Sequence, residues 1–385
     1  MKQKEMTKKK RNRIIVISSV LLLIAVFVIS GFILLHSYIK KMNIQTSSDV
    51  SGNKVQEALV SEGVDGDAEA TGAENADELE SASEDTDPTL PDSSEADIAA
   101  MEEKIRTNME EDSTSIVYDK DVFNVLLIGC DSRKSGGTGR SDTMILVSIN
   151  KNTKNIIVTS LLRDIYLQIP GKSNNRLNAA YAFGGADLLL STIKQNFKLE
   201  VNRYASIDFY AFIEVVDAVG GVTIDVTEKE IPVINKYVME INQLTGQEKE
   251  EDCLTETGDQ LLNGKQVLGY VRNRYVGNSD FERTARQRRV LKLVYDKVKK
   301  LNLIEMKDLL DTVLPQVTTN LSEGEIFTLI LSLPAYMNYD MEQWSIPMAN
   351  SYQSLRVRKM AVLGIDFEEN INELRKKIYR DAFSS

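Results

Sequence analysis

Histidine and cysteine are almost absent from this chain of 385 residues, which has one histidine, His36, and two cysteines, Cys130 and Cys253. A Ser-His-Asp or Cys-His hydrolase needs an imidazole base beside its nucleophile, and a zinc site needs three or four Cys or His ligands. These three residues cannot plausibly supply either kind of site. Any chemistry must therefore use carboxylates, arginine, lysine, tyrosine and cations that bind oxygen.

Positive charge is scarce in one long stretch. Residues 49–112 hold 21 acidic residues against three basic ones, a balance of −18. Because the net charge of the whole chain is −11, the remainder carries +7. Hydrophobic residues make up 42% of the chain, which is enough for a packed core. The mildly basic remainder suits an anionic ligand better than the overall charge suggests.

One hydrophobic run is long enough to cross a membrane. Residues 14–35 are uncharged, and as a helix they would span about 33 Å. Five Lys and Arg lie within residues 8–13, whereas only Lys40 and Lys41 follow closely. This bias predicts that residues 1–13 are a cytoplasmic tail and that 14–35 is a single-pass anchor in the cell membrane, with the rest of the chain extracellular. A cleaved secretory signal is the alternative, and it would also export the body.

The exported part divides by composition. Residues 36–117 are mostly acidic and small, so we interpret them as a disordered stalk, within which residues 95–111 could form a short helix. Residues 118–385 alternate apolar segments with helical patterns, which predicts an α/β layered domain. The expected strands are 123–128, 143–149, 155–161 and 222–226, and the expected helices are 177–197, 209–219, 264–273, 280–301 and 326–333.

Two carboxylates flank the loop between the first two expected strands. Asp131 directly follows residues 123–128, and Asp142 directly precedes the next strand. If the loop folds back, both can reach one cation, and Mg²⁺ prefers one or two carboxylates together with phosphate oxygens. An ion pair of either carboxylate with Arg133 or Arg140 is the alternative.

Arg163 follows the strand that ends at residue 161. An arginine at a sheet edge pairs naturally with a phosphate, and an ion pair with an acidic side chain is the alternative. Nucleic acid is a poor candidate ligand, because the sequence has no long basic stripe interleaved with aromatic residues.

More arginines gather farther along the chain. Arg272 and Arg274 precede an expected helix on which Asp280, Arg283 and Gln287 share one face. Several arginines close together repel one another unless an anion lies among them, so the pattern favours a site for a doubly charged anion. A solvated basic face is the alternative.

These residues lie in motifs through which the chain resembles the LytR-CpsA-Psr family, from about residue 124 to 301. The membrane-anchored layout is similar too. Leu162 stands where the family motif often has proline before Arg163. The motifs occur in order at residues 124–133, 140–144, 160–164, 177–185, 220–222, 262–274 and 280–287.

The resemblance implies a Mg²⁺-dependent phosphotransferase, with Mn²⁺ as the alternative ion. Such enzymes move a glycopolymer, either teichoic-acid-like or capsular, from a polyprenyl-pyrophosphate lipid to peptidoglycan through a phosphodiester bond. The implied fold is an α-β-α layered domain with a central mixed sheet and an apolar tunnel for the lipid.

The family's site residues carry over by position. Asp131 and Asp142 would hold the metal. Arg163 and Asp280 would be catalytic, Arg163 on the phosphate oxygens and Asp280 either orienting arginines or assisting deprotonation of the acceptor hydroxyl. The remaining pyrophosphate ligands would be Arg140, Arg272, Arg274, Arg283 and Gln287.

Two further functions use the same basic pocket. One is a non-catalytic regulator of envelope assembly that binds polyprenyl pyrophosphate, and the other is a pyrophosphatase acting on the lipid carrier. Outside the cell a disulfide between Cys130 and Cys253 is permitted, and their spacing leaves that pairing open.

Overall fold

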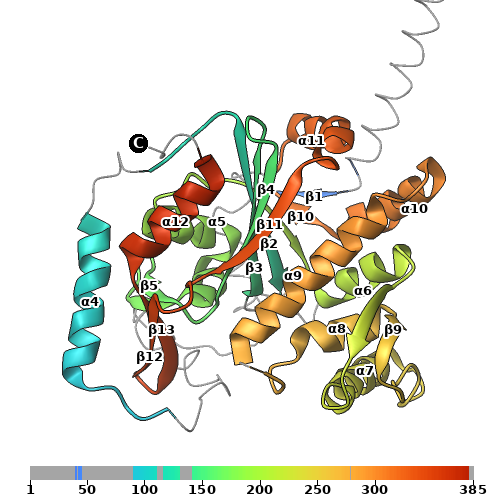
Figure 1. The fold of residues 1–385 in the computed structure, drawn as a ribbon, viewed down its shortest axis with the longest axis horizontal. Coiled ribbons are helices and arrows are strands. Elements are labelled where there is room, and N and C mark those ends of the chain that lie inside the picture. Colours follow the sequence, from blue (N-terminus) through green and yellow to red (C-terminus); the bar gives the residue numbers. More distant parts are fainter. Residues whose placement is uncertain are drawn as a thin grey trace, which may run out of the picture.

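A seven-stranded mixed sheet forms the centre of the protein (Figure 1). The computed structural model describes residues 40, 42–45, 90–110, 116–130, 141–277 and 279–380. Three neighbouring pairs of strands are parallel and three are antiparallel, which confirms the expected mixed sheet. The strand order is β1 (Asn43–Ile44), β10 (Thr318–Thr319), β7 (Tyr204–Ile207), β2 (Val122–Cys130), β3 (Ser141–Asn150), β4 (Asn155–Leu161) and β11 (Asp340–Ile346).

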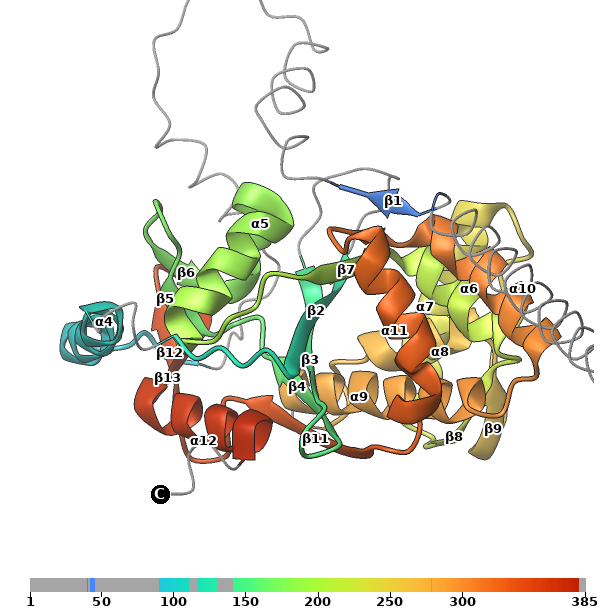
Figure 2. The ribbon, with the colours of Figure 1, turned by 90° about the horizontal axis from the view of Figure 1, so that it is seen from above.

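Helices cover both faces of the sheet, giving the layers seen in Figure 2. Side chains alternate along a strand, so Leu126 and Leu146 are buried on one face while Ile145 and Ile149 pack on the other. The first face carries α5 (Leu177–Phe197) and α12 (Phe367–Tyr379), and α4 (Glu95–Glu110) packs outside these two helices. The second carries α6 (Phe209–Ala218), α8 (Gly264–Arg272), α9 (Ser279–Val298), α10 (Leu303–Val313) and α11 (Glu323–Tyr336).

A second core lies beyond the second face. There α7 (Ile231–Thr245) packs on α8, and the hairpin β8 (Val222–Val226) and β9 (Gly258–Leu262) closes the layer. Two more hairpins lie near the first face (Figures 1 and 2). They are β5 (Tyr166–Gln168) with β6 (Asn174–Arg176), and β12 (Tyr352–Val357) with β13 (Met360–Ile365).

The folded body begins earlier in the chain than the expected boundary at residue 118. Helix α4 lies within the stretch that we interpret as a stalk, yet Met101 and Ile105 are only 4% and 1% exposed and join the main core. Asn108 also donates a hydrogen bond to the carbonyl of Asn196 at 3.0 Å. Only one stripe of this acidic helix is buried, which is why its composition resembles that of a spacer.

The expected elements within the body are present. Strands form at all four expected places, and the helices expected from residue 177 onward are found, each within a few residues of its predicted ends. Helix α5 is interrupted at Gly184 and Gly185, whose backbone angles are not helical. Within the described part of the chain, no helix has both the length and the hydropathy to cross a bilayer. The expected anchor, residues 14–35, lies outside that part.

Candidate functional site

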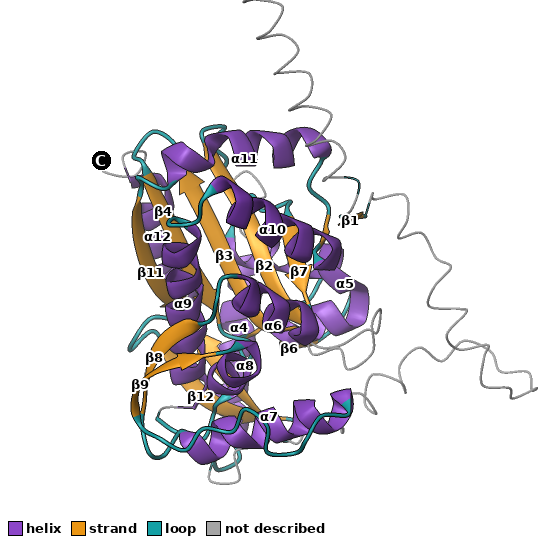
Figure 3. Ribbon diagram, turned by 90° about the vertical axis from the view of Figure 1, so that its right-hand side faces the viewer, coloured by secondary structure: helices purple, strands orange, loops and turns teal. Residues whose placement is uncertain are grey.

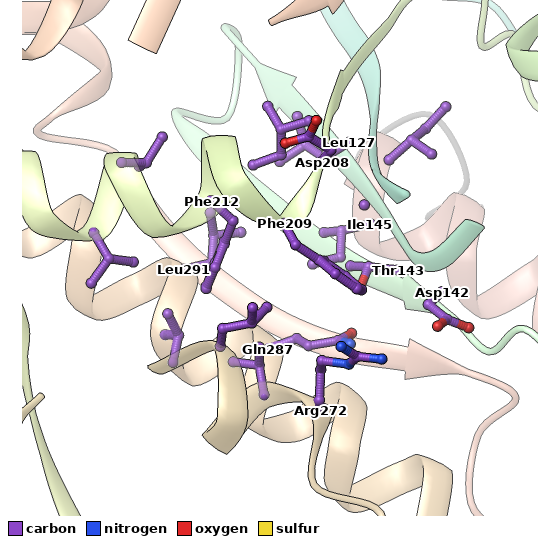
Figure 4. A pocket seen from close by; sticks show the side chains of 18 of the residues that line it. Leu127, Asp142, Thr143, Ile145, Asp208, Phe209, Phe212, Arg272, Gln287 and Leu291 are labelled. Atoms are coloured by element: carbon purple, nitrogen blue, oxygen red, sulfur yellow. The ribbon is translucent and has the colours of Figure 1, made fainter. Parts of the chain in front are cut away.

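A cavity of about 360 Å³ lies between the second face of the sheet and helices α6, α8 and α9. Leu127 and Ile145 form its floor on the sheet, and Phe212 and Leu291 project into it from the helices (Figure 4). Most of its wall is apolar, so it suits a hydrocarbon chain. Further wall residues are Ile128, Ala205, Ile207, Val215, Val216, Leu268, Val271, Val290, Val294, Val313 and Val317.

Apart from Asp208, which lies beside Leu127, the charged and amide groups that line this cavity gather at one end, which we call the polar end. It consists of Asp142, Arg272, Arg274, Arg283 and Gln287. Figure 4 shows the polar groups of Asp142, Arg272 and Gln287 together, away from Phe212 and Leu291. Five of the residues selected from the sequence therefore line one cavity, in a place where an anionic head group and an apolar tail can bind together.

Arg163 joins the carboxylates of this region. Its Nη1 donates to Oδ1 of Asp142 at 3.1 Å, and its Nε donates to Oδ2 of Asp280, also at 3.1 Å. The same Nε lies 3.4 Å from Oδ2 of Asp164. Arg163 is 8% exposed, and a guanidinium can hold several carboxylates because its donors form a rigid planar fork.

Arg283 completes the network from the next turn of α9. Its Nη2 lies 3.3 Å from Oδ2 of Asp280 and donates to the backbone carbonyl of Asp142 at 3.4 Å. Its buried Nε has no hydrogen-bond partner among the described residues. Burial, and next the charge of Arg163, lower the pKa of Arg283. A buried donor left without a partner favours binding of an anion here.

Two carboxylates of the network, the buried Asp280 and the partly buried Asp164, have pKa values shifted in opposite directions. Burial by itself would raise the pKa of Asp280, but the charges of Arg283 and Arg163 outweigh it and hold that pKa below its ordinary value. Burial raises the pKa of Asp164 to about 6, although Arg163 opposes the shift. Asp164 also accepts a hydrogen bond from Nη1 of Arg176 at 3.1 Å. Asp280 is therefore ionised at neutral pH and is a weak base.

The Arg272 guanidinium lies between two aromatic rings. It is 4.4 Å from the ring centre of Phe209 on α6 and 4.5 Å from that of Tyr237 on α7. Both contacts are within the range of cation–π attraction, which fixes the plane of the guanidinium. All three residues line the cavity, so the two rings hold the positive charge of Arg272 at the boundary between the apolar wall and the polar end.

Two glycines on α8 permit this arrangement. A Cβ on Gly264 would lie 2.3 Å from the carbonyl oxygen of Ile213 in α6, and one on Gly269 would lie 2.8 Å from that of Ile234 in α7. Helix α8 can therefore approach both neighbours closely. This packing brings Phe209 and Tyr237, one from each neighbouring helix, to Arg272 at the end of α8.

Arg286 holds the loop after α8. Its Nε donates to Oε1 of Glu230 at 3.1 Å, its Nη1 to the carbonyl of Asn273 at 3.2 Å and its Nη2 to that of Val276 at 2.9 Å. Although it belongs to the arginine-rich motif, Arg286 is therefore a structural residue. It fixes the backbone around Arg274.

The fit to a divalent cation depends on Asp142. Its carboxylate lines the cavity with 27% of the side chain exposed, and it offers the hard oxygen ligand that Mg²⁺ prefers. Among the described residues, no group of three or more His, Cys, Asp or Glu could hold a metal ion. Asp131 and Arg140, the other expected residues of this loop, lie outside the described residues. Asp142 with phosphate oxygens still matches the ligand set of Mg²⁺.

Sequence reasoning missed several residues that shape this region. Phe209 and Tyr237 carry no charge and lie far from Arg272 in the chain, so only the packing of three helices brings them together. Arg176 had a local signal, because it ends a short polar strand directly before α5.

Cys130 and Cys253 are both free thiols, and burial raises the pKa of Cys130.

Comparison with known proteins assigns the family. The sequence model of the LytR_cpsA_psr family matches residues 92–376. The polyisoprenyl-teichoic acid–peptidoglycan teichoic acid transferase TagU of Oceanobacillus iheyensis is 32% identical over 237 residues, or 60% of this chain and 68% of the relative. TagU of Enterococcus faecalis is 34% identical over 233 residues, which are 59% of this chain and 71% of that relative.

A solved structure agrees. It is that of the LytR-CPS2A-psr family protein YwtF (TagT) of Bacillus subtilis with bound octaprenyl pyrophosphate lipid. The TM-score is 0.51 and the identity 26%, covering 68% of this chain and 93% of the other. The range matched by the family model, residues 92–376, includes α4, the cavity and every described residue of its polar end. The chain therefore belongs to the LytR-CpsA-Psr family.

Proposed function

We propose that this protein is an enzyme that transfers a glycopolymer from a polyprenyl-pyrophosphate lipid to peptidoglycan through a phosphodiester bond. The observation that carries the proposal is the cavity, which joins an apolar wall to a cluster of guanidinium and carboxylate groups. The names of the TagU relatives and the lipid bound to TagT support the same substrates.

The apolar wall would take the polyprenyl tail and the polar end its pyrophosphate. Arg272, Arg274 and Arg283 would neutralise the phosphate oxygens, and Gln287 would donate its amide to them. Phosphoryl transfer depends on positioning and charge neutralisation more than on a protein nucleophile. A site without histidine or an activated cysteine is therefore adequate.

The reaction breaks one bond and forms one. The acceptor hydroxyl attacks the phosphorus that carries the glycopolymer, the bridging oxygen leaves with the polyprenyl phosphate, and the hydroxyl proton passes to a base. Bound at Asp142, and at Asp131 by the family motif, Mg²⁺ would supply Lewis-acid neutralisation of the pyrophosphate.

Asp280 orients the arginines in this proposal and does not remove the proton. Its carboxylate is 9% exposed and held by Arg163 and Arg283, and its lowered pKa makes it a poor base. Of the two roles expected for this residue, the geometry favours orientation. Arg163 would hold the carboxylate of Asp142, which lines the cavity, and that of Asp280 beside it.

The test is transfer by the purified full chain with a polyprenyl-pyrophosphate-linked glycan and peptidoglycan. Asp142→Asn and Arg272→Gln should each reduce transfer by about 100-fold, as loss of one charged contact in a reacting site does. Arg203→Gln is the matched control, because Arg203 pairs with Glu325 outside the cavity and should keep wild-type transfer.

The outcomes separate the competing functions. Wild-type transfer by both site variants rejects the residue assignment. Lipid binding without transfer at every Mg²⁺ concentration indicates a lipid-binding regulator of envelope assembly, and release of free phosphate without an acceptor indicates a lipid pyrophosphatase.

We also propose that residues 14–35 anchor the protein in the cell membrane with the catalytic body outside.

A further inference from the structure

Strand β1 is joined to the edge of the sheet by specific bonds. The backbone N–H of Asn43 donates to the carbonyl of Val317 at 3.3 Å, and that of Gln45 donates to the carbonyl of Thr319 at 2.8 Å. The Asn43 side chain adds a hydrogen bond from Nδ2 to Oγ1 of Thr318 at 3.2 Å. An edge strand offers such backbone groups to any extended segment, so the side-chain bond helps to select this one.

Side-chain packing adds to the docking of β1. The hydroxyl of Tyr204 donates to Oε1 of Gln45 at 3.0 Å. Ile44 and Met42 pack against Leu321 and Ile326, at the start of α11. Figures 1 and 2 show β1 beside α11 at one end of the molecule. The contacts are both polar and apolar, so they fix this short segment in one register.

The chain is attached to the body a second time at residue 90. The carbonyl of Leu90 accepts a hydrogen bond from Nε of Arg356 at 2.8 Å, and Oγ of Ser93 accepts one from the backbone N–H of Arg356, also at 2.8 Å. Residues 46–89 therefore connect two points that both lie on the folded body. They do not set the distance between the body and whatever precedes β1.

The attachment of β1 shortens the tether. From residue 35, the end of the expected anchor, to Asn43 is eight residues, which span about 29 Å at most. Without β1 the tether would run to residue 89, with a fully extended length of roughly 190 Å and an average span of about 40 Å as a flexible coil. A folded body of this size is about 50 Å across. The short tether therefore decides which end of the body meets the bilayer.

The tethered edge also borders the cavity. Val317 accepts the hydrogen bond from Asn43 and lines the cavity wall. It leads into β10, which is separated from β3 by β7 and β2, so it lies about 14 Å across the sheet from Asp142. A lipid with its pyrophosphate at the polar end can therefore extend its tail toward the edge where β1 enters.

We propose that β1 is a docking strand that holds the α11 end of the body against the bilayer, so that the Val317 side of the cavity faces the lipid from which the substrate comes. The proposal rests on the expected anchor and deepens the proposed function. In this proposal residues 36–42 are the tether that sets the distance between the expected anchor and the body. Residues 46–89 do not affect that distance.

Two insertions of the same flexible sequence test the proposal in the full chain reconstituted in liposomes. A Gly-Ser segment of about 20 residues, with an average span of about 25 Å, is placed after Ser37 in one variant and after Gly66 in the other. If β1 docks, only the insertion after Ser37 lengthens the tether. The insertion after Gly66 is the matched control, because it lies between two attached points.

Distance to the bilayer is read by energy transfer from tryptophan to dansyl-labelled lipid head groups. Trp344, the single native tryptophan, is replaced by phenylalanine. One probe is Leu331→Trp on α11, where the native side chain is 64% exposed. The other is Leu244→Trp at the end of α7, where it is 55% exposed. Figures 1 and 3 place α11 and α7 at opposite ends of the body.

We expect more efficient energy transfer from the tryptophan at position 331 than from the tryptophan at position 244. The insertion after Ser37 should lower the signal at 331 by about twofold or more, since it roughly doubles the reach of the tether. The insertion after Gly66 should leave it unchanged. In an Ile44→Asp background, which breaks the apolar contact of β1, the insertion after Gly66 should lower the signal as well.

Equal signals from both probes would overturn the proposal, and so would equal effects of the two insertions in the native background. Energy transfer needs neither a glycan donor nor an acceptor. A positive result with no transferase activity would therefore reject the proposed function alone, and a negative result with full activity would reject the docking strand alone.

Discussion

At the scale of single residues, Arg163 determines the charge balance beside the cavity. It contacts Asp142, Asp164 and Asp280, which come from three different segments of the chain. Each buried carboxylate would be costly without a cationic partner, and the arginines would repel one another without the carboxylates. The polar end is therefore assembled before any substrate arrives, so binding need not reorganise it.

The raised pKa of Asp164 predicts a pH dependence of stability. Its folded-state pKa of about 6 lies above its ordinary value, so the folded state holds this proton more tightly. The stabilisation is present at low pH, and the free energy of unfolding should fall as the pH rises from about 4 to about 6. The lowered pKa of Asp280 acts in the opposite direction near pH 4, where its unfolded form is still partly protonated, so the contribution of Asp164 is clearest between about pH 5 and 6.

Urea denaturation at several pH values within this window checks the trend. Asp164→Asn should flatten the slope, because asparagine does not titrate. Asp308→Asn is the matched control, since the Asp308 side chain is 70% exposed and should leave the slope unchanged. An equally steep slope in Asp164→Asn would show that another group is responsible.

The sequence could identify charged residues but not the partners of each. Spacing on a helix placed Asp280, Arg283 and Gln287 on one face, and the structure puts all three at or beside the polar end. It could not show that Phe209 and Tyr237 enclose Arg272, because those contacts join helices that are not adjacent in sequence. Local periodicity carries no information about such contacts.

At the scale of elements, helix α8 determines the position of Arg272. The helix begins with a capping box, in which Asn263 accepts from the N–H of Gln266 and the Gln266 side chain accepts from the N–H of Asn263. Close packing at Gly264 and Gly269 then fixes it against α6 and α7. Arg272 ends this helix, so any shift of α8 moves its charge.

Gly264→Ala should therefore lower the free energy of unfolding by about 1–3 kcal/mol, the usual cost of overpacking. The added methyl would meet the backbone of Ile213, which cannot rotate away as a side chain can. Denaturant unfolding measures the loss. Gly324→Ala is the control, because nothing lies within 4 Å of its added Cβ, and it should be neutral or up to about 1 kcal/mol more stable. Equal stability of the two variants would contradict the packing argument.

The apolar stripe on α9 shows that the hydrophobic pattern of a helix predicts its buried face but not the cavity beside that face. Val290, Leu291 and Val294 recur at helical spacing, which predicts a buried face. The face is turned inward as expected, but it forms part of a cavity wall. Periodicity reports which side of a helix avoids water, and it does not report whether the facing layer fills the space.

At the scale of the whole molecule, the cavity exists because three helices arch over one face of the sheet without filling the gap. A bulkier side chain in the cavity wall should exclude the polyprenyl tail without affecting the binding of pyrophosphate at the polar end. Val294→Trp should weaken binding of a polyprenyl pyrophosphate by about tenfold or more, which is about 1.4 kcal/mol, and leave binding of inorganic pyrophosphate unchanged.

Calorimetric titration with both ligands measures this difference. Leu331→Trp is the control, because it adds the same ring on an exposed helix away from the cavity wall and should bind both ligands like the wild type. If Val294→Trp loses both ligands equally, the tail and the head group do not occupy separate parts of the cavity.

The layered fold was predictable because its strands are short apolar runs separated by clear helical patterns. The sequence predicts no strand after residue 301, although that stretch supplies β11 and the β12–β13 hairpin. Strands β11 and β12 mix polar and apolar residues, and the place of β11 in the sheet depends on a partner far away in the chain. For example, Asp340 pairs with Asn155. The sequence does suggest a short helix at residues 95–111, close to α4, but it does not show that this helix packs into the core, because its buried stripe matters only once the main core exists.

The position of the body and its covalent attachment are carried by different parts of the chain. Strand β1 fixes position by a few non-covalent bonds, whereas the peptide chain that joins it to the rest runs through residues 46–89. A single proteolytic cut in that stretch would leave the catalytic body held only by β1. Because so few non-covalent bonds hold β1, such a cut would release an intact, folded body from the proposed anchor.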